Sequence, residues 1–201
     1  MLYSIYAEST PNPEVMKFVS NRMLADKSIE FLTVSEAKKI PMIHKIFSLP
    51  FVESIFLSSN FISVKKSNNI EWGEILIELR NFITTTLNES DIQNYTENIS
   101  AEDLITKKSS TIEKEKTNED IKRSDDENEI IQLLNDYIRP AVEGDGGAIE
   151  FSSFNDGIVK VILKGACSGC PSSTATLKGG IESLLIQKLG DKIKEVVALN
   201  G

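Results

Sequence analysis

Two cysteines, Cys167 and Cys170, are the residues of this 201-residue chain whose type and spacing could do chemistry. They are its only cysteines, and they stand in the sequence Gly-Ala-Cys-Ser-Gly-Cys-Pro at positions 165–171. A thiolate is a soft ligand that suits zinc, copper(I) or an iron–sulfur cluster. Two intervening residues allow both sulfurs to face one metal centre, and Gly169 permits the tight backbone path. The pair therefore indicates a metal or redox site.

The neighbouring residues place this pair on a loop between a strand and a helix. Residues 158–163 (Ile-Val-Lys-Val-Ile-Leu) are typical of a strand, and residues 172–189 are typical of a helix. The start of a helix leaves unpaired N–H groups and a partial positive charge beside the sulfurs. This environment favours the thiolate over the thiol.

The number of cysteines limits what one chain can hold. An iron–sulfur cluster is usually held by four cysteines, and a closed structural zinc site also needs four ligands. This chain supplies two cysteines. The residues alone leave three interpretations open: two chains share one metal centre, the pair forms a dithiol and disulfide, or the pair has no chemical role.

Composition and charge narrow the class of protein. The net charge of −8 argues against nucleic acid as a partner, because phosphate binding needs a basic surface. No apolar run approaches the ~20 residues that span a bilayer, so no membrane partner is expected. Residues 1–8 lack the basic start and apolar core of a signal peptide, and the Arg-rich character of a transit peptide. Two cysteines at this spacing without an export signal suggest a reducing compartment, and we expect a cytoplasmic protein.

Residues 1–87 are predicted to form a compact α/β domain with the element order β-β-α-β-β-α. Alternating apolar residues indicate four strands, at 2–7, 15–19, 52–57 and 61–65. A helix is expected to start with a cap at Ser35, with Pro41 either near that start or splitting the segment. Its apolar face would carry Ile40, Ile43, Ile46 and Phe47. A second helix is expected at 72–86.

This first segment offers no catalytic constellation. His44 is the only histidine of the chain, and its place in the middle of a predicted helix favours a surface or packing role over ligation. No second histidine exists to complete a pairing of a nucleophile with a base. The residues therefore assign no site to this domain.

Residues 88–128 differ in character and are predicted to form a disordered, charged linker. They carry twelve Asp or Glu against six Lys or Arg, and their apolar residues are isolated. Such a segment cannot bury enough apolar surface to offset its ordering entropy. A short helix at 101–108 is the one regular element expected there.

Residues 129–201 are predicted to form a second small domain with the order α-β-β-α-β. Its first helix is expected to stop near Arg139, because Pro140 follows. A hairpin is expected from strands at 148–154 and 158–164, since Asp156-Gly157 suits a two-residue turn. A closing strand is expected at 193–199. The fold class is therefore α+β, with two small α/β domains joined by a flexible acidic linker.

The glycine-rich loop at 144–147 is expected to be a turn from helix to strand. A turn of this kind needs a positive φ, which we assign to Gly144. Gly146 and Gly147 are instead candidates for letting the backbone approach the cysteine loop. A turn or capping role is expected for Asp145.

The chain resembles a known family at these motifs. Residues 139–147 (Arg-Pro-Ala-Val-Glu-Gly-Asp-Gly-Gly), residues 165–173 and Thr176-Leu177-Lys178 resemble the NifU C-terminal domain of Nfu-type iron–sulfur proteins. The first segment resembles the Nfu N-terminal domain through Thr10-Pro11-Asn12-Pro13, Lys17-Phe18 and residues 61–64.

This resemblance implies an iron–sulfur cluster scaffold or carrier rather than an enzyme. It implies that Cys167 and Cys170 ligate a [4Fe–4S] cluster shared between two subunits, so that the cluster-bound form is a homodimer. It also implies partners: apo-proteins that receive the cluster, and an upstream assembly scaffold. The N-terminal domain would recognise partner proteins, and the resemblance carries over no ligand to it.

Two other functions remain open. A strand–CxxC–helix order also describes thioredoxin-like proteins, so the same pair could serve a thiol–disulfide oxidoreductase. Against this, the residue directly before Cys167 is not Trp, and the order α-β-β-α-β is not that of thioredoxin. The third possibility is an interaction adaptor with a structural zinc between two subunits.

Overall fold

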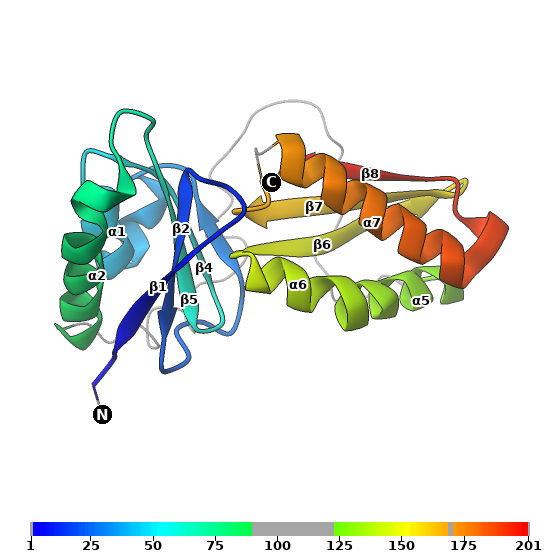
Figure 1. Cartoon of the computed structure of the whole chain (residues 1–201). Helices are drawn as coiled ribbons and strands as arrows, with labels where there is room; N and C mark the ends of the chain where they lie inside the picture. The colour runs from blue at the N-terminus through cyan, green and yellow to red at the C-terminus, as the bar shows by residue number, and fades with distance from the viewer. Residues whose placement is uncertain (1, 90–122, 169–170, 201) are drawn as a thin grey trace.

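The computed structural model describes residues 2–89, 123–168 and 171–200, and it contains two units that each have their own sheet and helices (Figure 1). We call residues 2–89 the N-terminal unit and the described residues from 123 to 200 the C-terminal unit. The predicted α+β fold class is confirmed. The expectations of disorder and of a helix at 101–108 fall at 90–122, outside the described residues.

The N-terminal unit is built on a five-stranded antiparallel sheet in the order β1-β2-β5-β4-β3. Four of its strands were predicted. The additional strand, β3, has only three residues, which is too short for alternation to be visible in the sequence. The strands are β1 (Ile5–Ser9), β2 (Val15–Ser20), β3 (Ile29–Phe31), β4 (Val52–Ser58) and β5 (Phe61–Lys66).

Two α-helices, α1 (Pro41–Phe47) and α2 (Trp72–Glu89), cover the face of this sheet that points away from the C-terminal unit (Figure 1). Pro41 splits the predicted first helix into a 3-10 turn, η1 (Glu36–Lys39), and α1. Proline suits the first turn of α1, because no N–H is needed there. The expected capping bond from the Ser35 side chain is not formed.

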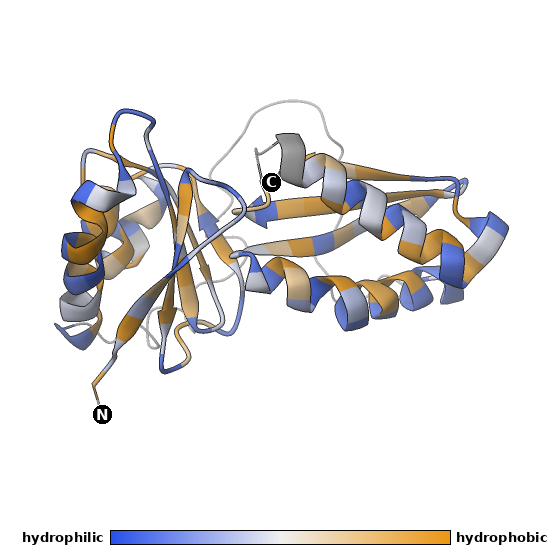
Figure 2. Cartoon of the chain, in the orientation of Figure 1, coloured by the Kyte–Doolittle hydropathy of each residue, from blue (hydrophilic) through white to orange (hydrophobic). Residues whose placement is uncertain are grey.

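The core of the N-terminal unit lies between these helices and the sheet. Apolar residues are concentrated along the central strands, and the connecting loops are mostly hydrophilic (Figure 2). The four residues predicted for the apolar face of α1 are all buried. Fully buried side chains from both layers fill this core: Phe18, Ile40, Ile43, Ile62 and Ile83.

The C-terminal unit has the predicted order α-β-β-α-β around a three-stranded sheet, β6-β7-β8. β6 and β7 are antiparallel, whereas β8 pairs parallel to β7 after the chain has passed through α7. Asp156 and Gly157 both have positive φ, which confirms the predicted hairpin turn. The elements after the first helix are β6 (Gly147–Asn155), β7 (Ile158–Gly165), α7 (Pro171–Leu189), η3 (Gly190–Lys192) and β8 (Glu195–Asn200).

The first helix of this unit does not stop near Arg139 as predicted. α5 (Asp125–Leu133) continues into a π-helical turn, η2 (Leu134–Ile138), and the chain resumes as α6 (Arg139–Gly144). Pro140 lies in the first turn of α6, where its missing N–H leaves no helical hydrogen bond unmade. The proline therefore changes the helical register instead of ending the helix.

α5 begins inside the range predicted to be linker. The Glu127 N–H donates to Ser124 Oγ (3.2 Å), and the Ser124 N–H donates to Glu127 Oε2 (2.9 Å). This reciprocal capping box satisfies two N–H groups at the start of the helix. Of the helices that the structure describes, none is long and apolar enough to cross a membrane.

Gly147, the first residue of β6, lies unusually close to the residues that lead into and form the cysteine loop. A Cβ atom at this position would lie 2.6 Å from the Lys164 carbonyl oxygen and 2.9 Å from Cys167 Sγ. Real Cβ atoms do not approach other atoms so closely. One neighbour is a backbone oxygen and the other is the sulfur of a buried side chain, so neither is the end of a flexible side chain. Only glycine therefore lets β6 pass Cys167 at this distance.

Replacing Gly147 with alanine should lower the free energy of unfolding of the C-terminal unit by about 1–3 kcal/mol, because backbone must shift to admit the Cβ. Hydrogen exchange of β6 and β7 amides, followed by mass spectrometry, should become faster. The control is Gly179→Ala in α7, where a Cβ meets nothing within 4 Å. Unchanged exchange in Gly147→Ala would show that the loop is not closely packed against β6.

Candidate metal centre

Cys167 lies on the loop between β7 and α7, as the sequence predicted. Cys167 is only 5% exposed, and it packs in the core of the C-terminal unit with Val161, Leu163 and Ile181. Cys170 lies outside the described residues. The structure thus places one of the two predicted ligands at a strand end, with its sulfur turned inward.

Backbone hydrogen bonds hold the described part of this loop. The Ala166 N–H donates to the Gly146 carbonyl (3.2 Å), and the Ser168 N–H donates to the Gly165 carbonyl (3.0 Å). Gly165 has a φ of 65°, a left-handed conformation that glycine adopts without steric cost. The Thr174 hydroxyl donates to the Cys167 carbonyl (3.4 Å) and so connects the loop to the first turns of α7.

The glycine-rich loop at 144–147 packs against the cysteine loop. The positive φ lies at Gly146 (82°) and not at Gly144, which is the last residue of α6. The assignment to Gly144 was therefore wrong, because the helix continues through it. The prediction that Gly146 and Gly147 let the backbone approach the cysteine loop is confirmed. Asp145 is the C-cap residue of α6, in agreement with its predicted role.

A cavity of about 440 Å³ lies beside Cys167. Its walls come mainly from α7 and from the end of the preceding helical segment, and they are largely apolar. Pro11 of the N-terminal unit contributes to the same walls. The C-terminal lining includes Ile138, Asp145, Leu177, Gly180 and Ile181.

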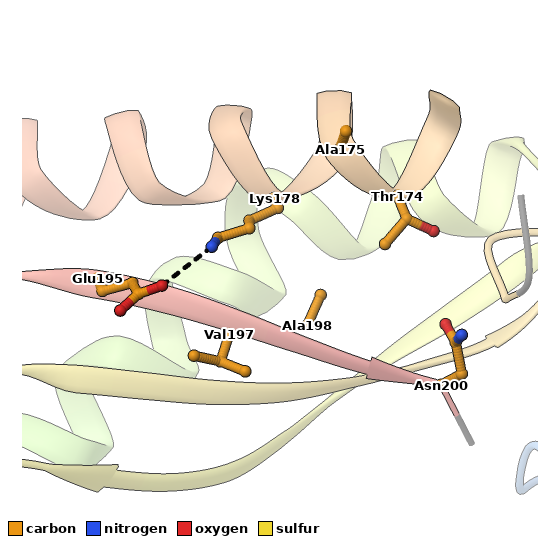
Figure 3. A pocket seen from close by; sticks show the side chains of 7 residues that line it. All are labelled: Thr174, Ala175, Lys178, Glu195, Val197, Ala198 and Asn200. Atoms are coloured by element: carbon orange, nitrogen blue, oxygen red, sulfur yellow. Dashed lines mark hydrogen bonds and ion pairs between the residues drawn. The ribbon is translucent and has the colours of Figure 1, made fainter. Parts of the chain in front are cut away.

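Thr176 and Lys178 belong to one predicted motif but line different pockets. Thr176 lines the cavity beside Cys167. Lys178 instead lines a separate pocket between α7 and β8, where its ammonium pairs with Glu195 Oε1 at 3.1 Å (Figure 3). Because both side chains are well exposed, this ion pair adds little stability, but it connects α7 to the edge strand. Lys178 is therefore no candidate ligand.

The ligands that this chain can offer at the cavity are sulfur atoms, which suit zinc, copper(I) or an iron–sulfur cluster. Cys167 offers one soft sulfur donor at the cavity, and the sequence spacing brings Cys170 within two residues of Ser168. Among the residues that the structure describes, no group of three or more His, Cys, Asp or Glu is placed to hold a metal ion. His44 is half-buried on α1 and lines a shallow pocket with Lys38 and Lys45.

Four described side chains of the N-terminal unit form hydrogen bonds with the two segments that meet just before Cys167, the glycine-rich loop and the end of β7. Each contact is a hydrogen bond to backbone of the C-terminal unit. The donors and acceptors are Ser63 Oγ to the Gly146 carbonyl (2.6 Å), Lys17 Nζ to the Gly144 carbonyl (3.1 Å), Asn12 Nδ2 to the Ala166 carbonyl (3.4 Å) and the Gly165 N–H to Glu30 Oε1 (2.9 Å).

Sequence reasoning assigned none of these residues to the site. Asn12, Lys17 and Ser63 stand in the stretches that resemble the Nfu N-terminal domain, so a signal existed, but nothing in the sequence connected them to the cysteines. Glu30 lies on the unpredicted strand β3. Burial raises the pKa of its carboxyl group, although the hydrogen bond from Gly165 and the charge of Lys164 both oppose this rise.

Comparison with known proteins matches each unit to a family. Residues 5–90 match the family described as "Scaffold protein Nfu/NifU N terminal". Residues 130–197 match the family described as "NifU-like domain". The two matches therefore include the four N-terminal contact residues and both cysteines.

Several relatives are similar along most of the chain. A Drosophila willistoni protein named "NFU1 iron-sulfur cluster scaffold homolog, mitochondrial" is 32% identical over 187 residues, 90% of this chain and 58% of that protein. The Arabidopsis thaliana "NifU-like protein 4, mitochondrial" is 33% identical over 198 residues, 93% of this chain and 63% of that protein. The chain spans less than two thirds of the length of either relative. With both family matches in order along one sequence, the chain belongs to the Nfu family of NifU-like proteins.

Proposed function

We propose that this protein is an iron–sulfur cluster scaffold and carrier. The observation that carries the proposal is Cys167 on the strand-to-helix loop of a NifU-like domain, at the wall of a cavity, with Cys170 three positions further along the sequence. A relative's name, "iron-sulfur cluster scaffold homolog", supports the same function. The cluster is cargo here, so the protein binds and releases it and is not an enzyme.

Two chains together supply the ligands. Each chain gives Cys167 and Cys170, so that four thiolates surround one [4Fe–4S] cluster at a two-fold interface. Isologous pairing suits this count, because the described residues hold no further ligand group. The cluster-bound form is therefore a homodimer. α7 begins at Pro171, directly after Cys170 in the sequence, and a helix start favours a thiolate over a thiol.

Sharing the cluster between chains makes it transferable. When the two chains separate, each loses half of the cluster's protein ligands, and thiolates of an apo-protein can replace them by exchange. The partners on the receiving side are apo-proteins that need a cluster, and on the supplying side an upstream assembly scaffold. Recognition of these partners is assigned to the N-terminal unit.

Cysteine-to-alanine substitution tests the ligands. Anaerobic reconstitution of the parent with iron and sulfide should give brown protein with about four irons per two chains. Cys167→Ala or Cys170→Ala should lose this iron, with little change in the far-ultraviolet circular dichroism spectrum. The control Ser168→Ala alters a residue between the cysteines and should keep the cluster.

The same experiment separates the alternative functions. A variant lacking one cysteine that still binds a full cluster would disprove the ligand assignment. Colourless protein that forms a reversible disulfide would favour a thiol–disulfide oxidoreductase.

Removal of the metal tests the shared site. Stripping iron from reconstituted protein with a chelator should convert the dimer to a monomer, because the cluster itself joins the chains. Native mass spectrometry and sedimentation measure this change directly. A dimer that persists after complete loss of iron would show that protein contacts, and not the cluster, hold the two chains together.

Cytoplasmic residence is also part of the proposal. The names of the relatives place those proteins in mitochondria, so the point needs its own measurement. Cells that make this protein can be fractionated and probed with an antibody against the C-terminal unit. We expect the protein in the soluble cytoplasmic fraction, and its recovery in an organelle fraction would overturn this part.

A further inference from the structure

One transverse row of residues crosses the whole N-terminal sheet and faces the C-terminal unit. Strand register pairs Glu8 with Lys17, Lys17 with Ser63, Ser63 with Phe56 and Phe56 with Glu30. Directly paired residues of neighbouring strands lie on the same face of a sheet. We call these five residues the contact row.

Three members of the contact row bind backbone of the C-terminal unit directly. Lys17, Ser63 and Glu30 make hydrogen bonds to Gly144, Gly146 and Gly165. Glu8 acts through Lys17, because its carboxylate lies 3.3 Å from the Lys17 ammonium. These bonds reach the glycine-rich loop at 144–147 and the end of β7, which meet next to Cys167, and not the Asp156-Gly157 end of the hairpin.

The contacts are buried as well as directional. Ser63 is 2% exposed and Lys17 is 8% exposed, although both lie on the sheet face without helices. Buried polar groups of this kind need partners, and here the C-terminal unit supplies them. Three apolar side chains of the same face, Val19, Phe56 and Phe61, form a buried cluster with Ala148 of β6.

Two glycines of the C-terminal unit make room for this face. A Cβ at Gly165 would lie 2.8 Å from the Phe56 ring, and a Cβ at Gly146 would lie 2.9 Å from Ser63 Oγ. Both residues have positive φ, so their turns already favour glycine. The absence of a side chain then allows the N-terminal sheet to approach the backbone that leads to Cys167.

The N-terminal unit therefore occupies the end of the C-terminal unit that a second chain needs. The end of β7 and the start of α7 both point toward the N-terminal sheet (Figure 1). Four thiolates around one cluster require the partner's cysteine loop to come into contact with this loop. Cys167 itself packs in the core of the C-terminal unit, and the N-terminal unit closes the cavity beside it through Pro11.

We propose that the N-terminal unit is an intramolecular cover of the cysteine loop, whose docking competes with cluster-bridged pairing of two chains. This inference rests on the proposed carrier function. By linkage, each contact that stabilises docking weakens cluster binding, and a bound cluster weakens docking by the same free energy. Docking again after transfer prevents the emptied loop from taking the cluster back.

Thiol labelling tests the cover without iron. In a Cys170→Ser background, Cys167 is the only thiol of the chain, and its reaction with an aromatic disulfide reagent can be followed by absorbance. Glu30→Ala removes the acceptor of the Gly165 N–H, and Ser63→Ala removes the donor to Gly146. Each should raise the labelling rate about tenfold, because undocking removes Pro11 from the wall of the cavity through which the reagent reaches Cys167.

Two matched variants separate docking from general effects. Glu30→Gln keeps an oxygen that can accept from Gly165 and should label at a rate within about twofold of the parent. Glu53→Ala removes another glutamate of the same sheet, which pairs with Lys65 and not with the C-terminal unit. It should leave labelling unchanged. Fluorescence of Trp72, the only tryptophan, verifies that the N-terminal unit stays folded in every variant.

Reconstitution in the background with both cysteines then tests competition. Glu30→Ala should take up its cluster faster than the parent and give more dimer, whereas Glu30→Gln should behave as the parent. If Glu30→Ala and Ser63→Ala label no faster than the parent while folded, the cover does not exist. If they label faster but bind the cluster more weakly, the N-terminal unit supports the site and the competition is wrong. A parent that binds no cluster refutes the carrier function, while labelling still decides the docking.

Discussion

One carbonyl oxygen joins the parts of this molecule that the site requires. The Gly146 carbonyl accepts a hydrogen bond from the Ala166 N–H and a second from the Ser63 hydroxyl. A carbonyl oxygen has two lone pairs, so both bonds can form at once. The first bond joins the residue before Cys167 to the glycine-rich loop at 144–147, and the second attaches the N-terminal sheet. The two hydrogen bonds to this one carbonyl oxygen therefore hold both the residue before Cys167 and the N-terminal sheet.

Glycines bring backbone of neighbouring segments close to the described part of the cysteine loop. Gly146, Gly147 and Gly165 each leave out a side chain where another segment passes. Among the described residues that line the cavity beside Cys167, Asp145 alone carries a charged side chain. The properties of the bound cargo then depend on which protein surface lies against the loop, which can be the N-terminal sheet, a second chain or a receiving protein.

Local features of the fold could be predicted from the sequence, and contacts between distant segments could not. The Asp156-Gly157 turn and the apolar face of α1 depend on residues a few positions apart, so pattern and turn chemistry were sufficient. Pro140 misled because a proline that ends a helix and one that begins a new helical turn look alike in sequence. The capping box of Ser124 and Glu127 was visible but lay inside a charged stretch that favoured disorder.

At the candidate site, too, local features could be predicted from the sequence and contacts between distant residues could not. The cysteine pair was identified by spacing alone, and its family by two motifs. The bond between Glu30 and Gly165 joins residues 135 positions apart, and that between Ser63 and Gly146 joins residues 83 positions apart. No periodicity relates such positions, and β3, which carries Glu30, is too short to leave a pattern.

The parallel pairing of β7 and β8 has a topological consequence. Parallel neighbours cannot be joined by a tight turn, so the chain must return along the sheet before β8 can begin. The cysteine loop begins this connection from β7 to β8, and α7 makes up most of it. The segment that carries the thiols is therefore also the only covalent route to the last strand, and its length is constrained by the need to complete the sheet.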